Sequence, residues 1–217
     1  MSSKTHPTRH ECLDAFLALI AETGWPAASV AAVAARLGVS PAVVLETAGD
    51  RFEMLAAVGR RADAAALKAA DDAGGSMGVR DRLFELLMAR FDALARHRPA
   101  IRALMRAARR DPALAAFFAT RLPRSLALLA ETAGVGTMGV AGMARVAALG
   151  GLYLKVVRTW LDDDSEDMGT TMAALEKALA RAEQWADRCR PLRRSAPAAP
   201  DAPSAADPGP VGTPIGI

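Results

Sequence analysis

Hydroxyl side chains in the first quarter of the chain are spaced as in a unit that binds phosphate groups. Ser29 and Ser40 each stand directly before a short run of helix-forming residues, and Thr47 follows two helical turns after Ser40. The free N–H groups at the start of a helix bind anions, and a nearby hydroxyl adds a hydrogen bond. Arg36 and Arg51 supply positive charge in the same segment. This chemistry requires two short helices whose first turns are open to a ligand.

Capping residues and glycines divide this segment into helices. Apolar residues over 13–20 recur at helical spacing and predict a first helix. Ser29 and Ser40 are N-caps of the second and third helices, and Asp50 caps a longer fourth helix. Glycine is favoured directly after the last helical residue because it adopts positive φ without strain. The predicted ends of the first three helices are Gly24, Gly38 and Gly49.

The run from Ser29 to Thr47 has the order of a helix-turn-helix, with a three-residue turn Gly-Val-Ser that starts at Gly38. Together with Gly24-Trp25 before it and Asp50-Arg-Phe-Glu-Met-Leu after it, the segment resembles the tetracycline-repressor (TetR) family of transcriptional regulators. The resemblance implies a homodimer with a three-helix DNA-binding head and a divergent helical domain, in which a small ligand changes the distance between the two heads. The residues expected at the DNA are Ser29, Arg36, Ser40, Pro41, Ala42, Val43, Glu46, Thr47 and Arg51.

The third helix departs from the family pattern at Pro41, Leu45, Glu46 and Ala48, and it carries no Lys or Arg. Residues 1–60 as a whole contain five basic and six acidic residues. Affinity for DNA comes largely from the neutralisation of phosphates by basic side chains. A second interpretation therefore stays open, in which the head is a retained helical subdomain that binds DNA weakly or not at all.

The positive charge of the chain lies in its middle. The net charge is +3, and residues 61–110 contain eleven basic and six acidic residues. Six of the basic residues are arginines between 96 and 110, several of which fall on one side of a helix by their spacing. We expect them to form a solvated face, with an anionic ligand, a lipid headgroup surface or a partner as alternatives.

The remaining sequence predicts further helices and an irregular tail. The helix over 146–161 is largely apolar and is expected to be buried almost all round. The acidic segment 162–167 is expected to be a solvated turn that caps the last helix. The fold expected is all-α with about nine helices, and its parts are a helix-turn-helix head (1–60), a helical ligand-binding and dimerisation domain (61–190) and a disordered tail rich in Pro and Ala (191–217).

A second resemblance concerns the C-terminal half. The segments 79–94, 153–168 and 172–176 resemble the lipid-binding family of ubiquinone biosynthesis of Coq9 type, which implies an accessory protein that presents an isoprenoid lipid to a hydroxylase. Both resemblances imply an apolar cavity for a hydrophobic small molecule or an isoprenoid lipid, and methionine suits such a lining. Ordinary core positions are the alternative for each candidate. The candidates are Phe84, Met88, Met105, Phe118, Met143 and Tyr153.

Other classes of function find little support in the sequence. Three histidines at 6, 10 and 97 give no metal cluster, and neither a phosphate-binding Gly-rich loop nor a nucleophile with a base is apparent. We therefore expect a protein that is not an enzyme and has no cofactor. The longest candidate for a membrane span, 149–160, contains Lys155 and Arg158 and is too short, so no transmembrane segment is expected. The polar N-terminus has no signal peptide, which indicates a cytoplasmic location.

Overall fold

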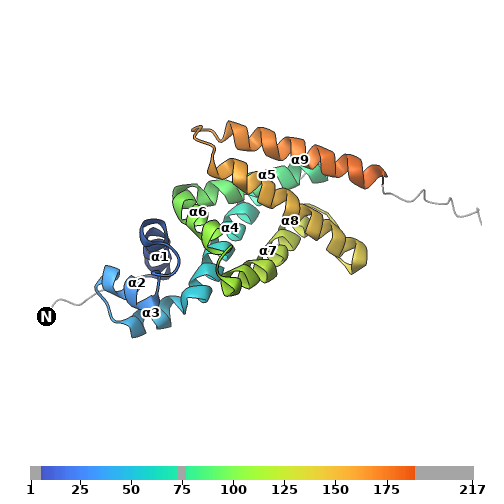
Figure 1. The fold of residues 1–217 in the computed structure, drawn as a ribbon. Coiled ribbons are helices and arrows are strands. Elements are labelled where there is room, and N and C mark those ends of the chain that lie inside the picture. Colours follow the sequence, from blue (N-terminus) through green and yellow to red (C-terminus); the bar gives the residue numbers. More distant parts are fainter. Residues whose placement is uncertain (1–5, 73–76, 189–217) are drawn as a thin grey trace, which may run out of the picture.

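The computed structural model describes residues 6–72 and 77–188, and this part of the chain is all helical, as expected (Figure 1). The predicted tail, 191–217, lies outside the described residues. Nine α-helices and one short 3-10 helix, η1, follow one another in the described part. They are α1 (Arg9–Thr23), α2 (Val30–Leu37), α3 (Pro41–Ala48), α4 (Arg51–Asp72), α5 (Val79–Leu94), η1 (Ala95–His97), α6 (Arg98–Ala107), α7 (Pro112–Thr132), α8 (Gly139–Leu161) and α9 (Gly169–Arg188).

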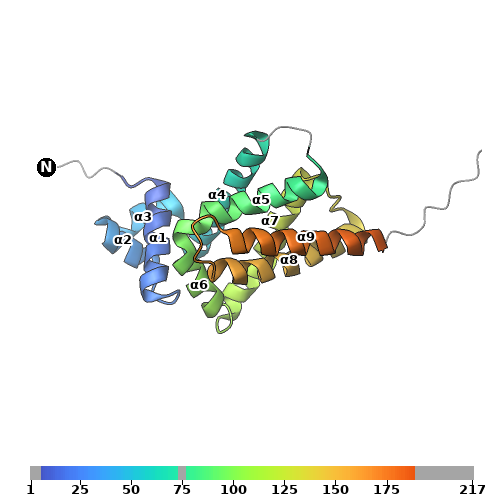
Figure 2. The ribbon, with the colours of Figure 1, turned by 90° about the horizontal axis from the view of Figure 1, so that it is seen from above.

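The head consists of α1, α2, α3 and the first turns of α4, and it lies at one end of an elongated molecule (Figure 2). The predicted caps are confirmed, since the Ser29 and Ser40 hydroxyls accept hydrogen bonds from the N–H groups of Ala32 and Val43. The core of the head is apolar and closed to solvent. Its members include Phe16, Leu17, Ile20, Trp25, Val33 and Val44, each at most 1% exposed.

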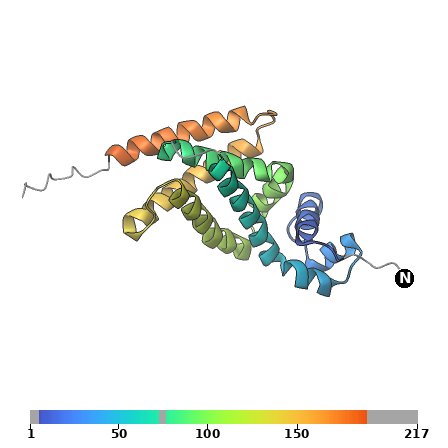
Figure 3. The ribbon, with the colours of Figure 1, turned by 180° about the vertical axis from the view of Figure 1, so that it is seen from behind.

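Helix α4 belongs to the head and to the body. It runs without a break from Arg51 to Asp72, through the position at which the sequence suggests a domain boundary (Figure 3). In the body it packs along α5, while α8 and α9 form a hairpin on the far side of α5. One continuous helix therefore connects the body to the head.

A buried polar cluster joins four body helices. Arg90 of α5 donates hydrogen bonds to Asp63 of α4 (2.8 Å), to Ser125 of α7 (3.2 Å) and to the hydroxyl of Tyr153 of α8. The Ser125 hydroxyl also donates to Asp63, at 2.7 Å. Burial lowers the pKa of Arg90, but Tyr153 and Asp63 outweigh that effect and raise it. The guanidinium is thus a permanent charge whose partners fix the relative positions of the four helices.

The basic run 96–110 is used inside the protein more than expected. Arg98 donates to the carbonyl oxygen of Asp163, and its guanidinium lies 5.0 Å from the ring centroid of Trp160. Arg102 pairs with Asp162 at 2.7 Å. Both arginines therefore attach α6 to the turn between α8 and α9, and the prediction of a wholly solvated face is wrong for them.

The acidic turn is also less solvated than expected at one position. Asp163 is 3% exposed, and its carboxylate accepts hydrogen bonds from the backbone N–H and hydroxyl of Thr171 in α9 and from Ser165. Burial alone would raise the pKa of Asp163, but these hydrogen bonds hold it far below its ordinary value. The expected capping role is confirmed for this carboxylate, which stays ionised because its donors replace water.

The face formed by α7 and α8 is more exposed than the sequence suggests. Both helices are long and apolar enough to cross a membrane by length and composition, with mean hydropathies of 1.3 and 1.5, so the expectation that no segment qualifies is wrong. The prediction that α8 is buried almost all round is wrong too. Only 22% and 28% of the residues in their most apolar windows are buried. The large exposed apolar side chains on this face are Leu128, Met138, Val140, Met143 and Leu154.

We expect Asp63→Ala to lower the free energy of unfolding by about 3–5 kcal/mol, because it leaves the Arg90 charge buried without its anionic partner. Urea denaturation followed by circular dichroism measures the change. The double variant Asp63→Leu with Arg90→Met is the control and should recover much of the loss, since it removes both charges. A loss in the double variant as large as in the single variant would contradict this account.

Candidate nucleic-acid interface

The turn between α2 and α3 fixes the geometry of the helix-turn-helix. The two helices meet at a bend of 108°, within the range typical of this motif. Gly38 has a left-handed backbone, with φ of 67°, and Val39 is half-buried between the helices. The αL conformation of Gly38 ends α2 and turns the chain. Only Val39 and Ser40 then precede the start of α3 at Pro41. The predicted motif is confirmed in its backbone form.

The surface of α3 is small and almost free of charge. Val44 and Ala48 face the core, and Val43 and Thr47 are half-buried. The Ser29 and Ser40 hydroxyl oxygens are occupied as caps, which leaves each hydroxyl hydrogen free to donate. The exposed side chains of the helix are Pro41, Ala42, Leu45 and Glu46.

The two arginines predicted at the DNA are both engaged within the head. Arg36 forms an ion pair with Glu22 of α1 at 2.5 Å. The Arg51 guanidinium lies 3.5 Å from the ring centroid of Trp25 and donates to the Trp25 carbonyl oxygen at 3.2 Å. Arg51 therefore stabilises the loop between α1 and α2, a role that its position in the sequence does not reveal. Arg36 is exposed and remains near the surface that α2 and α3 present.

Trp25 connects the head to the body. Its indole N–H donates to the carboxylate of Asp111 at 2.8 Å, and the same carboxylate caps α7 by accepting from the Leu114 N–H at 3.0 Å. Phe52 lies between the two parts, with ring centroids 5.4 Å from both Trp25 and Phe117. Asp111 is recognisable in the sequence as a cap, but its second partner is 86 residues away in the chain and only the fold reveals it.

A second junction lies at α1. Asp14 pairs with Arg61 of α4 at 2.8 Å and with Arg96 of η1 at 3.1 Å. The Nε2 atom of His97 lies 3.0 Å from a nitrogen of Arg61 and 2.9 Å from one of Arg96. Burial, with the charges of Arg96 and Arg61, lowers the pKa of His97 although Asp14 opposes it. A neutral ring accepting from both guanidinium groups fits this arrangement, which fixes α1 against α4 and α6.

The six candidate ligand residues lie in different environments. Tyr153 and Met88 are buried, Phe84, Met105 and Phe118 are half-buried, and Met143 is 63% exposed on α8. The Tyr153 hydroxyl is bonded to Arg90, and its ring stacks on Phe91 at 5.3 Å. None of the six lines either of the two pockets described for the chain. The hydrophobic ligand site stays a prediction.

Within residues 6–72 and 77–188, no group of three His, Cys, Asp or Glu side chains is placed to hold a metal ion.

The arrangement of the helices in the head and the body matches one class of known structures. The described chain has the fold of the TetR-family transcriptional regulators, in agreement with the resemblance of its first quarter. A TetR regulator from Nitrosomonas europaea is 27% identical, with a TM-score of 0.68 over 82% of this chain and 99% of that one.

More distant structures show the same fold. A TetR regulator from Rhodococcus sp. RHA1 has a TM-score of 0.57 at 15% identity, over 80% of this chain and 94% of that one. A transcriptional regulator from Pseudomonas aeruginosa PAO1, described as putative, has a TM-score of 0.54 at 22% identity. The match covers 83% of this chain and 92% of that one. No family model and no curated protein matches the sequence. The similarity of the C-terminal half to the Coq9-type family is not supported by these comparisons and stays a hypothesis.

We expect Gly49→Ala to lower the free energy of unfolding by about 1–3 kcal/mol. Gly49 has φ of 84°, and an added Cβ would lie 2.4 Å from a carboxylate oxygen of Glu53, which accepts from the Asp50 N–H at the start of α4. Thermal denaturation measures the change. Gly59→Ala is the matched control, since nothing lies within 4 Å of its Cβ position inside α4 and the substitution should stabilise the helix. Equal effects of the two variants would contradict the role of this corner.

Proposed function

We propose that the protein is a homodimeric, ligand-responsive DNA-binding transcriptional regulator of the TetR type, which acts in the cytoplasm by binding and not by catalysis. The observation that carries the proposal is a helix-turn-helix with a bend of 108° and an exposed α3 surface, inside a fold shared with a regulator at a TM-score of 0.68. Continuous α4 gives the body a direct mechanical connection to this surface. A ligand in the body that shifts α4 would change the spacing of the two heads of a dimer.

The chemistry of α3 suggests how it would select DNA. Ala42 and the ring of Pro41 are apolar and exposed, and small apolar groups discriminate by contact with thymine methyl groups in the major groove. Glu46 is an acceptor for the amino group of cytosine. The N-termini of α2 and α3, with their hydroxyls Ser29 and Ser40, are suited to hold phosphates. We therefore expect recognition that depends more on base contacts than on charge.

The test is binding of the purified protein to its own upstream DNA at several salt concentrations. Sequence-selective binding should weaken only gradually with salt, because α3 has no cation that displaces counterions. Thr47→Ala should weaken it about fivefold, the equivalent of one hydrogen bond of about 1 kcal/mol. Glu46→Gln should strengthen binding to unrelated DNA, because it removes a negative charge from a surface that approaches the polyanionic duplex.

The matched control for Thr47→Ala is Thr170→Ala, an exposed threonine in the first turn of α9. It should leave the affinity unchanged. Failure of the wild-type protein to select any fragment of its upstream DNA would sink the regulator proposal. Equal loss in both threonine variants would show that α3 does not contact the DNA.

The dimer is supported by the exposed apolar face of α7 and α8. Of its five large side chains, α8 carries three, Met138 caps the start of α8, and α7 carries Leu128. An exposed apolar face is normally covered by a partner. A lipid bilayer is the alternative, but Arg145, Lys155 and Arg158 are exposed on α8 itself. Charges at these places suit an interface rim between two copies and not the interior of a bilayer.

We expect Met143→Glu with Leu154→Glu to shift the chain from dimer to monomer at micromolar concentration, since two charges would be buried without partners. Sedimentation velocity measures the mass directly. Leu45→Glu is the control, because Leu45 is 53% exposed on α3, in the head, and its substitution should leave the dimer intact. A wild-type monomer, or a dimer that persists in the double variant, would contradict this interface.

The exposed apolar face also favours a second candidate function, that of an accessory protein that binds isoprenoid lipid. The two functions differ in whether the purified protein carries isoprenoid lipid and whether it binds DNA selectively. Isoprenoid lipid recovered by solvent extraction of the purified protein, combined with no selective DNA binding, would support the lipid-binding candidate. The hydrophobic residues nominated above for a ligand are then the first positions for substitution.

A further inference from the structure

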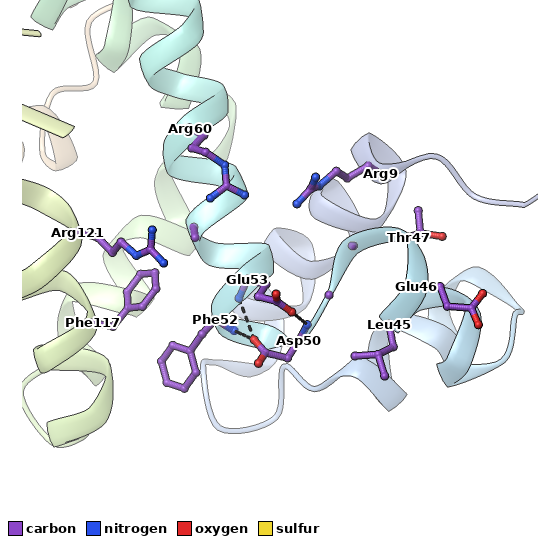
Figure 4. Close-up of a pocket in the computed structure, with 13 residues that line it drawn as sticks. Arg9, Leu45, Glu46, Thr47, Asp50, Phe52, Glu53, Arg60, Phe117 and Arg121 are labelled. Carbon is purple, nitrogen blue, oxygen red and sulfur yellow. Dashed lines mark hydrogen bonds between the residues drawn. The ribbon is translucent and has the colours of Figure 1, made fainter. Parts of the chain in front are cut away.

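A crevice of about 460 Å³ lies where the head meets the body (Figure 4). One wall is the end of α3 and the corner that leads into α4, and the opposite wall is α7. Its volume falls in the range of small-molecule sites, about 300–1,000 Å³. Two residues of the lining, Glu46 and Thr47, are also candidates for contact with DNA.

Three arginines from three helices converge on this crevice. Arg9 comes from α1, Arg60 from α4 and Arg121 from α7, and their guanidinium groups point into the same space in Figure 4. None of them forms an ion pair with any residue in 6–72 or 77–184. All three side chains are exposed, so an anion placed among them can accept charge-assisted hydrogen bonds from three helices.

The acidic residues of the lining form no ion pair with these arginines. The Asp50 carboxylate accepts hydrogen bonds from the N–H groups of Phe52 and Glu53, at 2.7 and 2.8 Å, and the Glu53 carboxylate accepts from the Asp50 N–H at 2.8 Å. Both are therefore engaged in capping α4. The Glu46 side chain points away from the arginines. The arginines therefore form one side of the crevice, and the carboxylates that cap α4 form another.

The crevice also offers aromatic surface. The ring centroids of Phe52 of α4 and Phe117 of α7 lie 5.4 Å apart at its edge. The guanidinium of Arg121 is 5.9 Å from the ring centroid of Phe117. We propose that this crevice binds a small organic anion, whose carboxylate or phosphate is held by Arg9, Arg60 and Arg121 and whose planar apolar part lies against the two phenylalanines. Guanidinium groups bind such anions through paired, charge-assisted hydrogen bonds.

The shape of the site favours a small molecule over the DNA backbone. Phosphates of a duplex are met by surfaces that project toward it, whereas Arg121 and Phe117 stand across a hollow on the body helix α7. A bound anion would connect α1, the end of α3, α4 and α7, and so fix the orientation of the head against the body. This consequence for regulation rests on the proposed DNA-binding function, but the binding of the anion does not.

The experiment is isothermal titration calorimetry of the full chain, without DNA, using benzoate, phenyl phosphate and the neutral benzamide as probes. At least one of the two anions should bind at one site per chain, and benzamide should not. Arg60→Ala and Arg121→Ala should each weaken the binding about tenfold, the effect of one charge-assisted contact. Arg124→Ala, which removes an exposed arginine of α7 that does not line the crevice, is the matched control and should bind as the wild type does.

Three outcomes would overturn the proposal. They are no binding of either anion at millimolar concentration, binding that Arg60→Ala and Arg121→Ala leave unchanged, and equal weakening by Arg124→Ala. A parallel DNA titration separates this site from the regulator function. If the two crevice variants lose DNA affinity and the dependence on salt becomes less steep, while no anion binds, the arginines hold the DNA backbone instead. Anion binding without any DNA binding would leave the site intact and sink only the regulator.

Discussion

The hydrogen bond between the indole of Trp25 and the carboxylate of Asp111 is the contact on which the arrangement of the two parts depends. The carboxylate serves two helices at once, because it also caps α7. Arg51 covers one face of the same indole and Phe52 approaches another, so the start of α4 is fixed to the same point. Asp14 with its arginines makes a second junction at α1. With two separate junctions, the head turns against the body only if both rearrange.

Charge is distributed in an unusual way for a protein that we propose binds DNA. The arginine at the start of α4 is stacked on Trp25, and Arg36 is paired with Glu22, so the α3 surface has little charge to offer. Three further arginines, Arg9, Arg60 and Arg121, line the crevice behind the motif. Because electrostatics supplies most sequence-independent affinity, this distribution favours a regulator that is selective and only weakly held on unrelated DNA.

The body combines a polar centre with an apolar outer face. Asp63, Arg90, Ser125 and Tyr153 join four helices through hydrogen bonds of fixed direction, which specifies one register where apolar side chains alone would allow several. On the outside, α7 and α8 keep large apolar side chains in solvent. Burial of that surface by a second copy would complete the core that a single chain leaves open.

The sequence by itself determined the helices of the head. Ser29, Ser40 and Gly38 act on their own neighbours along the chain, so caps and turns are visible in local spacing, and the family resemblance follows from them. Only the tertiary structure decided what distant residues do. The sequence suggested that Arg51 faces DNA, that α8 is buried and that Arg98 and Arg102 are solvated. In the structure, partners up to 65 residues away engage the three arginines, and one face of α8 is not covered by any described part of the chain. The physical reason is that burial and pairing depend on which helices meet, and helical periodicity shows that a face is apolar without showing what covers it.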